Sequence, residues 1–407
     1  MGRNSLILVI GWLVATSFVT ANTERKTIHV GGFEREYLIY TPNHPQREKV
    51  DGIIICLHGF GRTNDDFFGQ YDISGIAESL NMIIAAPQAL SEQDPRVILD
   101  AEIINSLTDN SISLHSVWGC GLNVRVSSFG MSLINVELNK EIDDVAFIDR
   151  MIDTILSDHS LPDQNIFMLG TSMGGFMTYQ YALRQGDRLS GIISIAGSMG
   201  LAVEGMDYAT KIPVCDFHSM TDEVVFYNGS QAQFPVVITL AMPKTDVINY
   251  WVTTNSASEP VTEPVQYYPS TNDITVVKIT YPDKDNEVIH YKIDGASHNY
   301  FFKKEEGDCM DHVEEITRFI QSHISEPPVE IQYITVQKLG FYPNPVQNMI
   351  YMDTESGIVS IFDLAGQTVF TQSFTHGTVD LSSLKPGMYI IQLQSENTNQ
   401  VNHLIKK

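Results

Sequence analysis

Short runs of apolar residues recur along much of the chain and are separated by stretches with helical periodicity. The runs are continuous in apolar character, which suits strands that are buried on both faces of a parallel sheet. They occupy residues 52–57, 82–86, 165–169, 191–196, 213–217 and 288–293. An antiparallel hairpin is expected before them, over residues 27–30 and 36–40, because Gly31 and Gly32 lie between two alternating segments.

Amphipathic stretches between the apolar runs predict helices. Residues 144–156 carry apolar side chains at helical spacing, and Asp143 or Asp144 precedes them as an N-cap. Residues 173–184 and 309–324 are two further helical stretches. Strands that alternate with helices predict an α/β fold with a mostly parallel sheet and helices on both faces.

The pattern changes after residue 324. The prolines in Glu326-Pro327-Pro328 cannot continue a helix and stiffen a connection, so residues 325–337 are predicted to be a linker. Short strands with intervening glycines follow, at residues 350–352, 358–363, 368–374 and 388–393. We therefore expect an α/β domain over residues 22–324 and a small all-β sandwich over residues 338–407.

The first residues have the pattern of an export signal. Arg3 provides a positive start, an apolar run extends from Leu6 to Val19, and Val19-Thr20-Ala21 is a small-residue cleavage site. The run is short for a membrane-spanning helix, and no other stretch is long enough. Residues 1–21 are predicted to be a signal peptide, and the mature protein is predicted to have no permanent membrane span.

Composition and charge narrow the range of partners. The chain is 43% hydrophobic and 18% charged, which is typical of a globular protein. Its formal net charge is −24, and an acidic surface repels phosphate, so nucleic acid is not an expected partner. No Walker-type phosphate loop is present, and no histidine and cysteine cluster has metal-ligand spacing. We expect neither a cofactor nor a metal.

The segment Gly170-Thr171-Ser172-Met173-Gly174 is the strongest chemical signal. It lies between a predicted strand and a predicted helix, where a tight turn with small neighbours exposes the serine hydroxyl above the sheet. The amides at the start of the helix can stabilise an oxyanion. Ser172 is therefore the predicted nucleophile.

A serine nucleophile needs an acid and a base, and in this fold they follow it in the order acid, then histidine. Asp222 and His298 each follow a predicted strand, at the carboxyl edge where open α/β sheets place their sites. Asp222 would orient the imidazole, and His298 would take the serine proton. The rivals are Asp216 and Asp294 for the acid and His290 for the base.

The oxyanion hole needs two backbone donors. His58-Gly59-Phe60-Gly61 follows the strand at residues 53–57, which is where the first donor belongs. Phe60 N–H and Met173 N–H are the predicted pair. His58 could itself be catalytic, but the chain order favours a structural role in holding its loop.

These motifs together resemble the polyhydroxybutyrate depolymerase and feruloyl esterase group of the α/β-hydrolase superfamily, over roughly residues 27–324. The matching segments are His58-Gly59-Phe60, Asp143-Asp144-Val145 with Phe147-Ile148, the serine turn, His218-Ser219 with Asp222, Val225 and Tyr227-Asn228-Gly229, Trp251, and Gly295 with His298. The group usually has glycine where Ser219 stands and often asparagine where Met173 stands. The resemblance implies a carboxylic-ester hydrolase that acts on a hydroxyalkanoate polyester or on a phenolic-acid ester of a polysaccharide.

The same resemblance suggests which residues surround the site. In this group the loop that carries Trp118 commonly lies over the site, so Trp118 and Tyr227 are candidate substrate contacts, and a core aromatic is the equal alternative for Trp118. Cys120 and Cys309 lie in loop-like sequence, and we predict a disulfide between them. Cys56 and Cys215 lie in predicted buried strands, where free thiols are expected.

The last 70 or so residues resemble the C-terminal sorting domain of type IX secretion in Bacteroidetes. The segments that carry the resemblance are Phe341-Tyr342-Pro343-Asn344-Pro345, Asp363-Leu364 with Gly366, Leu384 with Pro386-Gly387-Met388-Tyr389, and His403-Leu404-Ile405-Lys406-Lys407. This resemblance implies that the chain interacts with the type IX secretion machinery and is located outside the outer membrane or on the cell surface. A carbohydrate-binding module is the alternative.

The residues thus predict an extracellular serine ester hydrolase with an acyl-enzyme intermediate. An acetyl esterase on polysaccharide and a peptidase would use the same triad, because it transfers acyl groups from esters or amides. A non-catalytic surface binding protein on a hydrolase scaffold is the alternative from another class. It predicts a damaged triad or serine turn, and neither is visible.

Overall fold

The computed structural model divides the chain into two compact units, Met1–Ser325 and Glu326–Lys407. It describes residues 23–43, 49–71, 73–93, 95–108, 114–203, 210–233, 235–298, 300–325, 340–352, 354–395 and 398–407. The predicted signal peptide, residues 1–21, lies outside the described residues, and so does the predicted linker apart from Ser325. None of the helices in the described ranges has both the length and the apolar character that a bilayer crossing requires.

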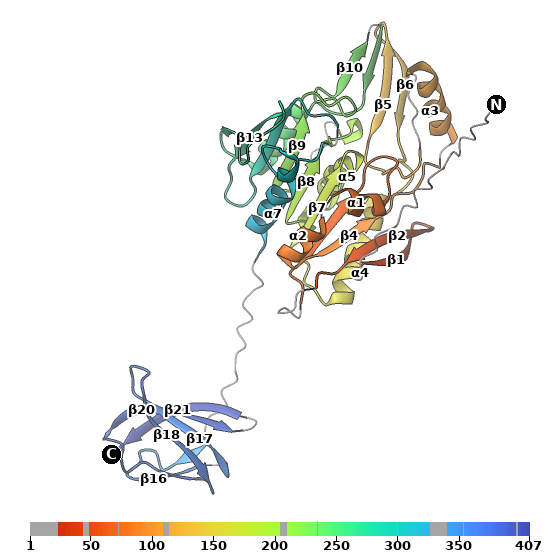
Figure 1. The fold of residues 1–407 in the computed structure, drawn as a ribbon. Coiled ribbons are helices and arrows are strands. Elements are labelled where there is room, and N and C mark those ends of the chain that lie inside the picture. The colour runs from red at the N-terminus through yellow and green to blue at the C-terminus, as the bar shows by residue number, and fades with distance from the viewer. Residues whose placement is uncertain are drawn as a thin grey trace, which may run out of the picture. The chain divides into compact units, whose positions relative to one another are not determined.

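A ten-stranded mixed sheet organises the first unit (Figure 1). Its strands lie in the order β1 (Thr23–Val30), β2 (Phe33–Tyr40), β4 (Ile83–Pro87), β3 (Ile53–Leu57), β7 (Ile166–Thr171), β8 (Gly191–Ile195), β9 (Val214–Ser219), β14 (Val288–Asp294), β13 (Thr275–Tyr281) and β12 (Val261–Pro264). The six strands from β4 to β14 are parallel, and antiparallel strands extend the sheet on both sides. The predicted buried runs are the six parallel strands.

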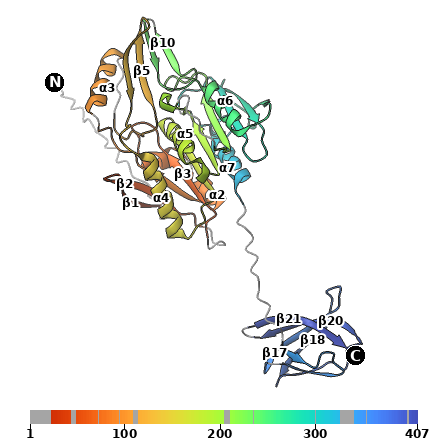
Figure 2. The same ribbon diagram turned by 180° about the vertical axis from the view of Figure 1, so that it is seen from behind.

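Helices cover both faces of this sheet, as the two views in Figures 1 and 2 show. One face carries α1 (Asn64–Gln70), α2 (Ile73–Leu80) and α7 (His312–His323), and the other carries α4 (Asp144–His159), α5 (Met173–Gln185) and α6 (Lys244–Asn255). Short 3-10 helices lie at Gly186–Arg188, Leu201–Val203 and Lys304–Glu306. Because strand side chains alternate between faces, Ile53 and Ile55 belong to the α4–α5–α6 core, whereas Ile54 and Cys56 belong to the α1–α2–α7 core.

A second, four-stranded antiparallel sheet was not predicted. It has the order β10 (Ser230–Gln233), β11 (Val236–Thr239), β5 (Asn123–Ser128) and β6 (Met131–Glu137). Helix α3 (Pro95–Thr108) contacts β6. Figure 1 shows this sheet extending beyond the central sheet. The strands β5 and β11, distant in sequence, pair directly, so this sheet depends on contacts that local patterns do not report.

The N-terminus of α4 contains the two acidic residues that precede it. Asp143 caps the helix by accepting from the Ala146 N–H at 3.0 Å, as predicted. Asp144 is fully buried and pairs with Arg35 of β2 at 2.6 Å, while its other oxygen accepts from the Gly119 N–H at 2.7 Å. This ion pair joins the second strand, the first turn of α4 and the segment around residue 119.

The second unit is an all-β sandwich, in agreement with the predicted strands. One sheet contains β15 (Phe341–Tyr342), β16 (Met349–Met352) and β19 (Thr378–Asp380). The other contains β18 (Thr368–Thr375), β17 (Ser356–Phe362), β20 (Gly387–Ser395) and β21 (Thr398–Lys406). Inward residues such as Ile350, Val359, Ile391 and Leu404 form one apolar core, so this unit has its own hydrophobic interior.

The predicted disulfide between Cys120 and Cys309 is wrong. All four cysteines are free and buried. Cys120 lies in the core on the α4–α5–α6 face and Cys309 lies in the core on the α1–α2–α7 face. The central sheet separates the two thiols. Cys56 and Cys215 are the buried free thiols that their strands predict.

Candidate active site

Ser172 lies at the sharp turn between β7 and α5. Its φ of 53° and ψ of −121° are a strained conformation for a residue with a side chain. The flanking glycines make this turn sterically feasible. A Cβ on Gly174 would lie 2.6 Å from the Leu57 carbonyl carbon and 2.8 Å from the His58 oxygen, and a Cβ on Gly170 would lie 2.5 Å from Thr178 Oγ1. The glycine pattern therefore lets α5 begin directly against β3 and the loop after it.

The fold brings three of the predicted residues into one hydrogen-bonded chain. His298 Nε2 lies 2.9 Å from Ser172 Oγ, and its Nδ1 lies 2.9 and 2.8 Å from the two Asp222 oxygens. The residues are far apart in sequence and come from the ends of β7, β9 and β14. In this arrangement Asp222 holds the imidazole with its proton on Nδ1, and Nε2 is free to accept the serine proton.

Asp222 is held as a carboxylate by donors on several sides. Burial acts to raise its pKa, but the hydrogen bond from His298, the nearby His218 ring and the Val224 N–H hold the pKa below its usual value. The Val224 and Val225 amides both donate to Asp222 Oδ1 at 2.8 Å. An ionised, oriented acid is the form that can stabilise an imidazolium on His298.

The loops that carry the acid and the base are joined directly. Ser219 Oγ donates to the Ala296 carbonyl at 2.6 Å, and Thr221 Oγ1 donates to the same oxygen at 2.9 Å. The Gly295 N–H donates back to Thr221 Oγ1 at 3.2 Å. Ser219 is the position where the resembling group usually has glycine, so in this chain the departure adds a hydrogen bond between the loops that carry Asp222 and His298.

The predicted oxyanion donors lie at the loop after β3 and at the start of α5. Within the described part of the chain, neither the Phe60 N–H nor the Met173 N–H has a hydrogen-bond acceptor. The loop passes close over the serine, because a Cβ on Gly59 would lie 3.3 Å from Ser172 Cβ. Both amides are therefore available for an oxyanion beside Ser172, and their role as the hole is part of the proposal below.

His58 fixes this loop and has a neutral ring. Its Nδ1 donates to the Gly59 carbonyl at 2.8 Å, and its Nε2 accepts from the Ala89 N–H at 3.1 Å. Burial lowers the pKa of His58 to about 4. These bonds give His58 a structural role, which was the favoured interpretation.

The rival acid and base residues belong to another cluster. Asp216 is fully buried, pairs with Lys244 at 2.7 Å and accepts from His290 Nδ1 at 2.8 Å. The Tyr227 hydroxyl lies 3.0 Å from His290 Nε2. Neither Asp216 nor His290 contacts Ser172, and Asp294 lies exposed at the end of β14. Lys244 was not singled out from the sequence, since no local pattern marks a buried lysine.

Of the two candidate substrate contacts, Trp118 has the core position that was its alternative, and Tyr227 belongs to the cluster around Asp216. Trp118 is fully buried, and its Nε1 donates to the His58 carbonyl at 2.9 Å, so its side chain supports the loop from below. Tyr227 is half-buried and bonded to His290. Neither lines the cavity beside the triad. Their local sequences do not show which way the side chains point, and only the packed structure does.

A cavity of about 340 Å³ lies beside His298. Polar groups dominate its walls, namely Arg62, Asp66, Thr171 and Glu223, with the rings of Phe67 and Tyr71. His58, Gly59, Val224 and His298 complete the lining. Glu223 also accepts the backbone N–H of His298, at 3.1 Å from Oε2. Sequence patterns gave no reason to select Arg62, Asp66 or Glu223, which lie on two loops and a short helix.

Among the described residues, no group of three or more histidine, cysteine or acidic side chains could hold a metal ion.

The site brings together a serine hydroxyl, an imidazole and a carboxylate, with two backbone amides close by. A parallel-centred sheet with helices on both faces, a strained serine between strand and helix, and an acid and a histidine at later strand ends define the α/β-hydrolase fold.

Two segments of the chain match known families. Residues 136–259 match the phospholipase/carboxylesterase family, and residues 340–407 match the secretion system C-terminal sorting domain. The chain thus combines an α/β-hydrolase domain with a sorting domain of the kind that directs type IX secretion to the cell surface or beyond. The sandwich of the second unit corresponds to that sorting domain.

Curated relatives and solved structures that resemble this chain have low sequence identity to it. Feruloyl esterase B of Talaromyces stipitatus and that of Talaromyces funiculosus are each 22% identical to this chain over 204 residues, which are 50% of this chain and 45% and 46% of the relatives. The chain thus spans less than half the length of these relatives. Acetyl xylan esterase from Aspergillus awamori aligns with a TM-score of 0.46 and 12% identity, over 73% of this chain and 99% of that one. S-formylglutathione hydrolase from Agrobacterium tumefaciens aligns at 0.44 and 11%, over 74% and 95%.

Proposed function

We propose that the protein is an exported serine carboxylic-ester hydrolase in which Ser172 is the nucleophile, His298 the general base and Asp222 the orienting acid. The observation that carries this proposal is the unbroken chain from Ser172 Oγ through His298 to Asp222, with every link between 2.8 and 2.9 Å. The strained serine turn and the match of residues 136–259 to the phospholipase/carboxylesterase family support it.

The reaction proceeds through an acyl-enzyme. Ser172 Oγ attacks the ester carbonyl carbon while His298 Nε2 takes the hydroxyl proton. The carbonyl oxygen becomes an oxyanion that the Phe60 and Met173 amides stabilise. Collapse of this intermediate breaks the bond to the alcohol oxygen, which leaves with the proton from His298. A water molecule then attacks the acyl-enzyme, gives its proton to His298, and releases the carboxylic acid and Ser172.

The cavity beside the triad favours an ester whose alcohol is a sugar. Carboxylates and a guanidinium pair with hydroxyl groups, and Arg62, Asp66 and Glu223 bring these groups to the cavity lining. A hydroxyalkanoate polyester presents few hydroxyl groups, so it would make fewer hydrogen bonds to the polar wall formed by Arg62, Asp66 and Glu223. The substrate class is therefore a phenolic-acid or acetyl ester of a polysaccharide, in keeping with the feruloyl esterase B relatives.

Three substrates offered side by side test this assignment. Feruloylated arabinoxylan oligosaccharide and acetylated xylan should be hydrolysed with a higher kcat/KM than polyhydroxybutyrate oligomers. Ser172→Ala should reduce hydrolysis of all of them, and of p-nitrophenyl acetate, to background while the circular dichroism spectrum is unchanged. Near-normal turnover by Ser172→Ala would refute the mechanism, and a preference for the polyester would refute the substrate class.

The C-terminal unit supplies the export route. Type IX machinery is the proposed partner of residues 338–407, and removal of this unit or its attachment to the surface follows translocation. A chain truncated after residue 337 should stay inside the producing cell yet keep esterase activity after purification, because the triad and both cores of the first unit lie before residue 326. Arrival of the truncated chain in the medium would contradict the export proposal.

A further inference from the structure

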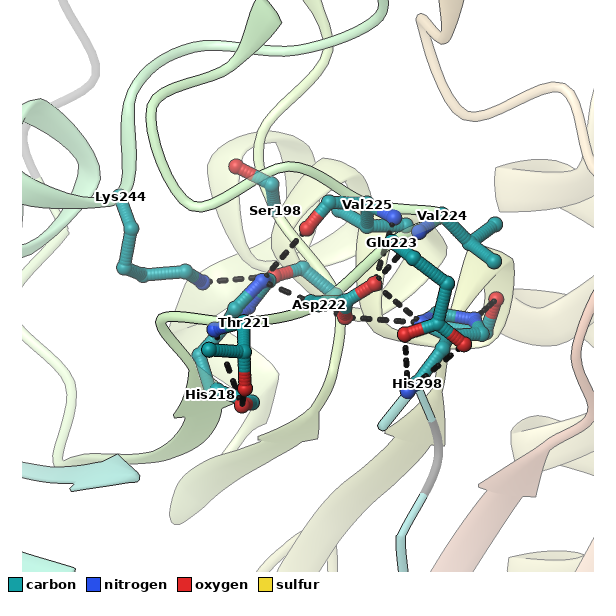
Figure 3. A network of polar contacts seen from close by, with 12 residues as sticks. Ser198, His218, Thr221, Asp222, Glu223, Val224, Val225, Lys244 and His298 are labelled. Atoms are coloured by element: carbon teal, nitrogen blue, oxygen red, sulfur yellow. Dashed lines mark hydrogen bonds and ion pairs between the residues drawn. The ribbon is translucent and has the colours of Figure 1, made fainter. Parts of the chain in front are cut away.

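His218 lies directly behind Asp222, and both of its ring nitrogens face oxygens that can only accept. Nδ1 lies 3.0 Å from the Gly197 carbonyl and Nε2 lies 2.8 Å from the Val225 carbonyl. Nε2 is also 3.6 Å from Asp222 Oδ2. A neutral imidazole has a single N–H, so only a doubly protonated ring can donate to both carbonyls. Figure 3 shows His218 between Lys244 and Asp222, with His298 beyond the acid.

The other buried histidines in the described residues differ in this respect. His58 Nε2 accepts from a backbone N–H, and so does His312 Nδ1, from Phe302 at 2.7 Å. His290 Nε2 faces the Tyr227 hydroxyl, which can donate to it. Each of these rings meets a donor at one nitrogen, so each can be neutral without facing two acceptors, although His312 Nε2 has no hydrogen-bond partner among the described residues. His218 is the one whose surroundings match the charged form.

The charges around His218 also balance best with a charged ring. Asp216 on the same strand is neutralised by the Lys244 ammonium at 2.7 Å. Asp222 has no such partner, because His298 must remain neutral before the reaction. A positive charge on His218 pairs with Asp222 and leaves the buried cluster without net charge, as buried ionised groups require.

We propose that His218 is a buried imidazolium that fixes the Asp222 carboxylate and its loop, and so acts as a positioning residue for the catalytic acid. This inference rests on the proposed function of Asp222. The ring links the Gly197 carbonyl to the Val225 carbonyl, which follows Asp222 by three residues, so it anchors the acid loop while its charge faces the acid.

Opposing influences act on this proton. Burial is the largest and lowers the pKa of His218, and the Lys244 ammonium lowers it further, whereas Asp216, Asp222 and the Val225 carbonyl raise it. The Tyr227 ring lies edge-on, 5.8 Å away, and brings no charge at neutral pH. Together these influences lower the pKa of His218, and against them the geometry favours the charged ring, because two carbonyl oxygens lie within hydrogen-bond distance of its two nitrogens.

The protonation state can be observed in the full-length protein at pH 7. Long-range nitrogen–proton NMR of histidine-labelled protein should show both His218 nitrogens as protonated, with the resonances assigned by their loss in His218→Gln. His58 serves as an internal reference for a neutral ring. A non-protonated nitrogen in His218 would overturn the proposal. Neutron diffraction from wild-type crystals gives the same answer if the variant does not fold.

A kinetic test separates the charge from a merely structural role. In His218→Gln the loss of a positive charge near the triad should move the acid limb of the kcat/KM profile for p-nitrophenyl acetate to higher pH, by about one unit. If His218 has a purely structural role, His218→Gln lowers kcat/KM without moving this limb. His290→Gln is the matched control, since it removes a buried ring of the neighbouring strand whose hydrogen bonds go to Asp216 and Tyr227 and not to Asp222, and it should leave the limb in place. A limb that is unmoved in His218→Gln, or that moves equally in both variants, would count against the charged ring.

Different experimental results would refute this inference and the proposed function. If Ser172→Ala keeps its activity, the triad is wrong whatever the state of His218. If Ser172→Ala is inactive and His218 is neutral, the esterase assignment remains and only the buried imidazolium is lost.

Discussion

Gly174→Ala tests how closely the serine turn depends on contact between α5 and the loop after β3, which carries His58 and Phe60. The added Cβ would lie 2.6 Å from the Leu57 carbonyl carbon and 2.8 Å from the His58 oxygen, and nearer still to the Leu57 oxygen. Ordinary contact begins near 3.4 Å. The helix or the loop must therefore shift by about 1 Å, and both are backbone that cannot rotate away. Such overpacking costs about 1–3 kcal/mol.

The same shift separates Ser172 and Met173 from Phe60, so activity should fall more than stability suggests. A misplacement of about 1 Å can cost on the order of 100-fold in rate. We expect kcat/KM for p-nitrophenyl acetate to fall by about that factor and the Tm to fall by several degrees. Gly59→Ala is a graded comparison, because its Cβ comes no closer than 3.3 Å to Ser172 Cβ, and its loss should be smaller.

Gly387→Ala in the C-terminal sandwich is the matched control. Its Cβ would meet only the Tyr389 ring, at 3.3 Å, so activity and the Tm of the first unit should not change. If Gly174→Ala keeps kcat/KM within a factor of about three, the reasoning about this contact is wrong, since a 1 Å shift is expected to cost far more.

The remaining predictions concern the acid, the buried ion pair, the thiols and pH. Asp222→Asn should lower kcat by about 10⁴-fold in a pre-steady-state assay, because the histidine loses the partner that fixes its tautomer. Arg35→Met should destabilise the fold by about 3–5 kcal/mol in urea unfolding, since it leaves Asp144 buried and unpaired, and Asp144→Leu added to it should recover much of this. All four thiols should resist Ellman's reagent until the protein is unfolded, and reductant should not change the Tm. The folded-state pKa values of Asp216 and Asp222 lie below the unfolded value of about 3.9, so their ionised forms stabilise the fold above that pH. This stabilisation is lost as the pH falls through the folded values, and Asp216→Asn should flatten the decline of Tm with acid.

The local signals in the sequence predicted the parallel strands, the serine turn and the α4 cap, because each depends on a few neighbouring residues. The strand order, the β5–β6 and β10–β11 sheet and the buried Lys244 depend on segments that meet only in the folded chain. The Cys120–Cys309 prediction failed for the same reason, since loop-like sequence does not say which face of the sheet a residue reaches. Trp118 looked like a substrate contact and is instead a buried support for the His58 carbonyl.

The hydrogen bonds from Ser219 and Thr221 to Ala296 join the loops that carry Asp222 and His298, and these loops supply part of the cavity lining. Glu223 and His298 lie on these joined loops, so a substitution there moves the groups that position Asp222 and His298. Arg62, which precedes α1, and Asp66, within α1, also line the cavity and share none of these bonds. Substitutions meant to change the alcohol preference should therefore begin at Arg62 and Asp66, because they leave the bonds between the Asp222 and His298 loops in place.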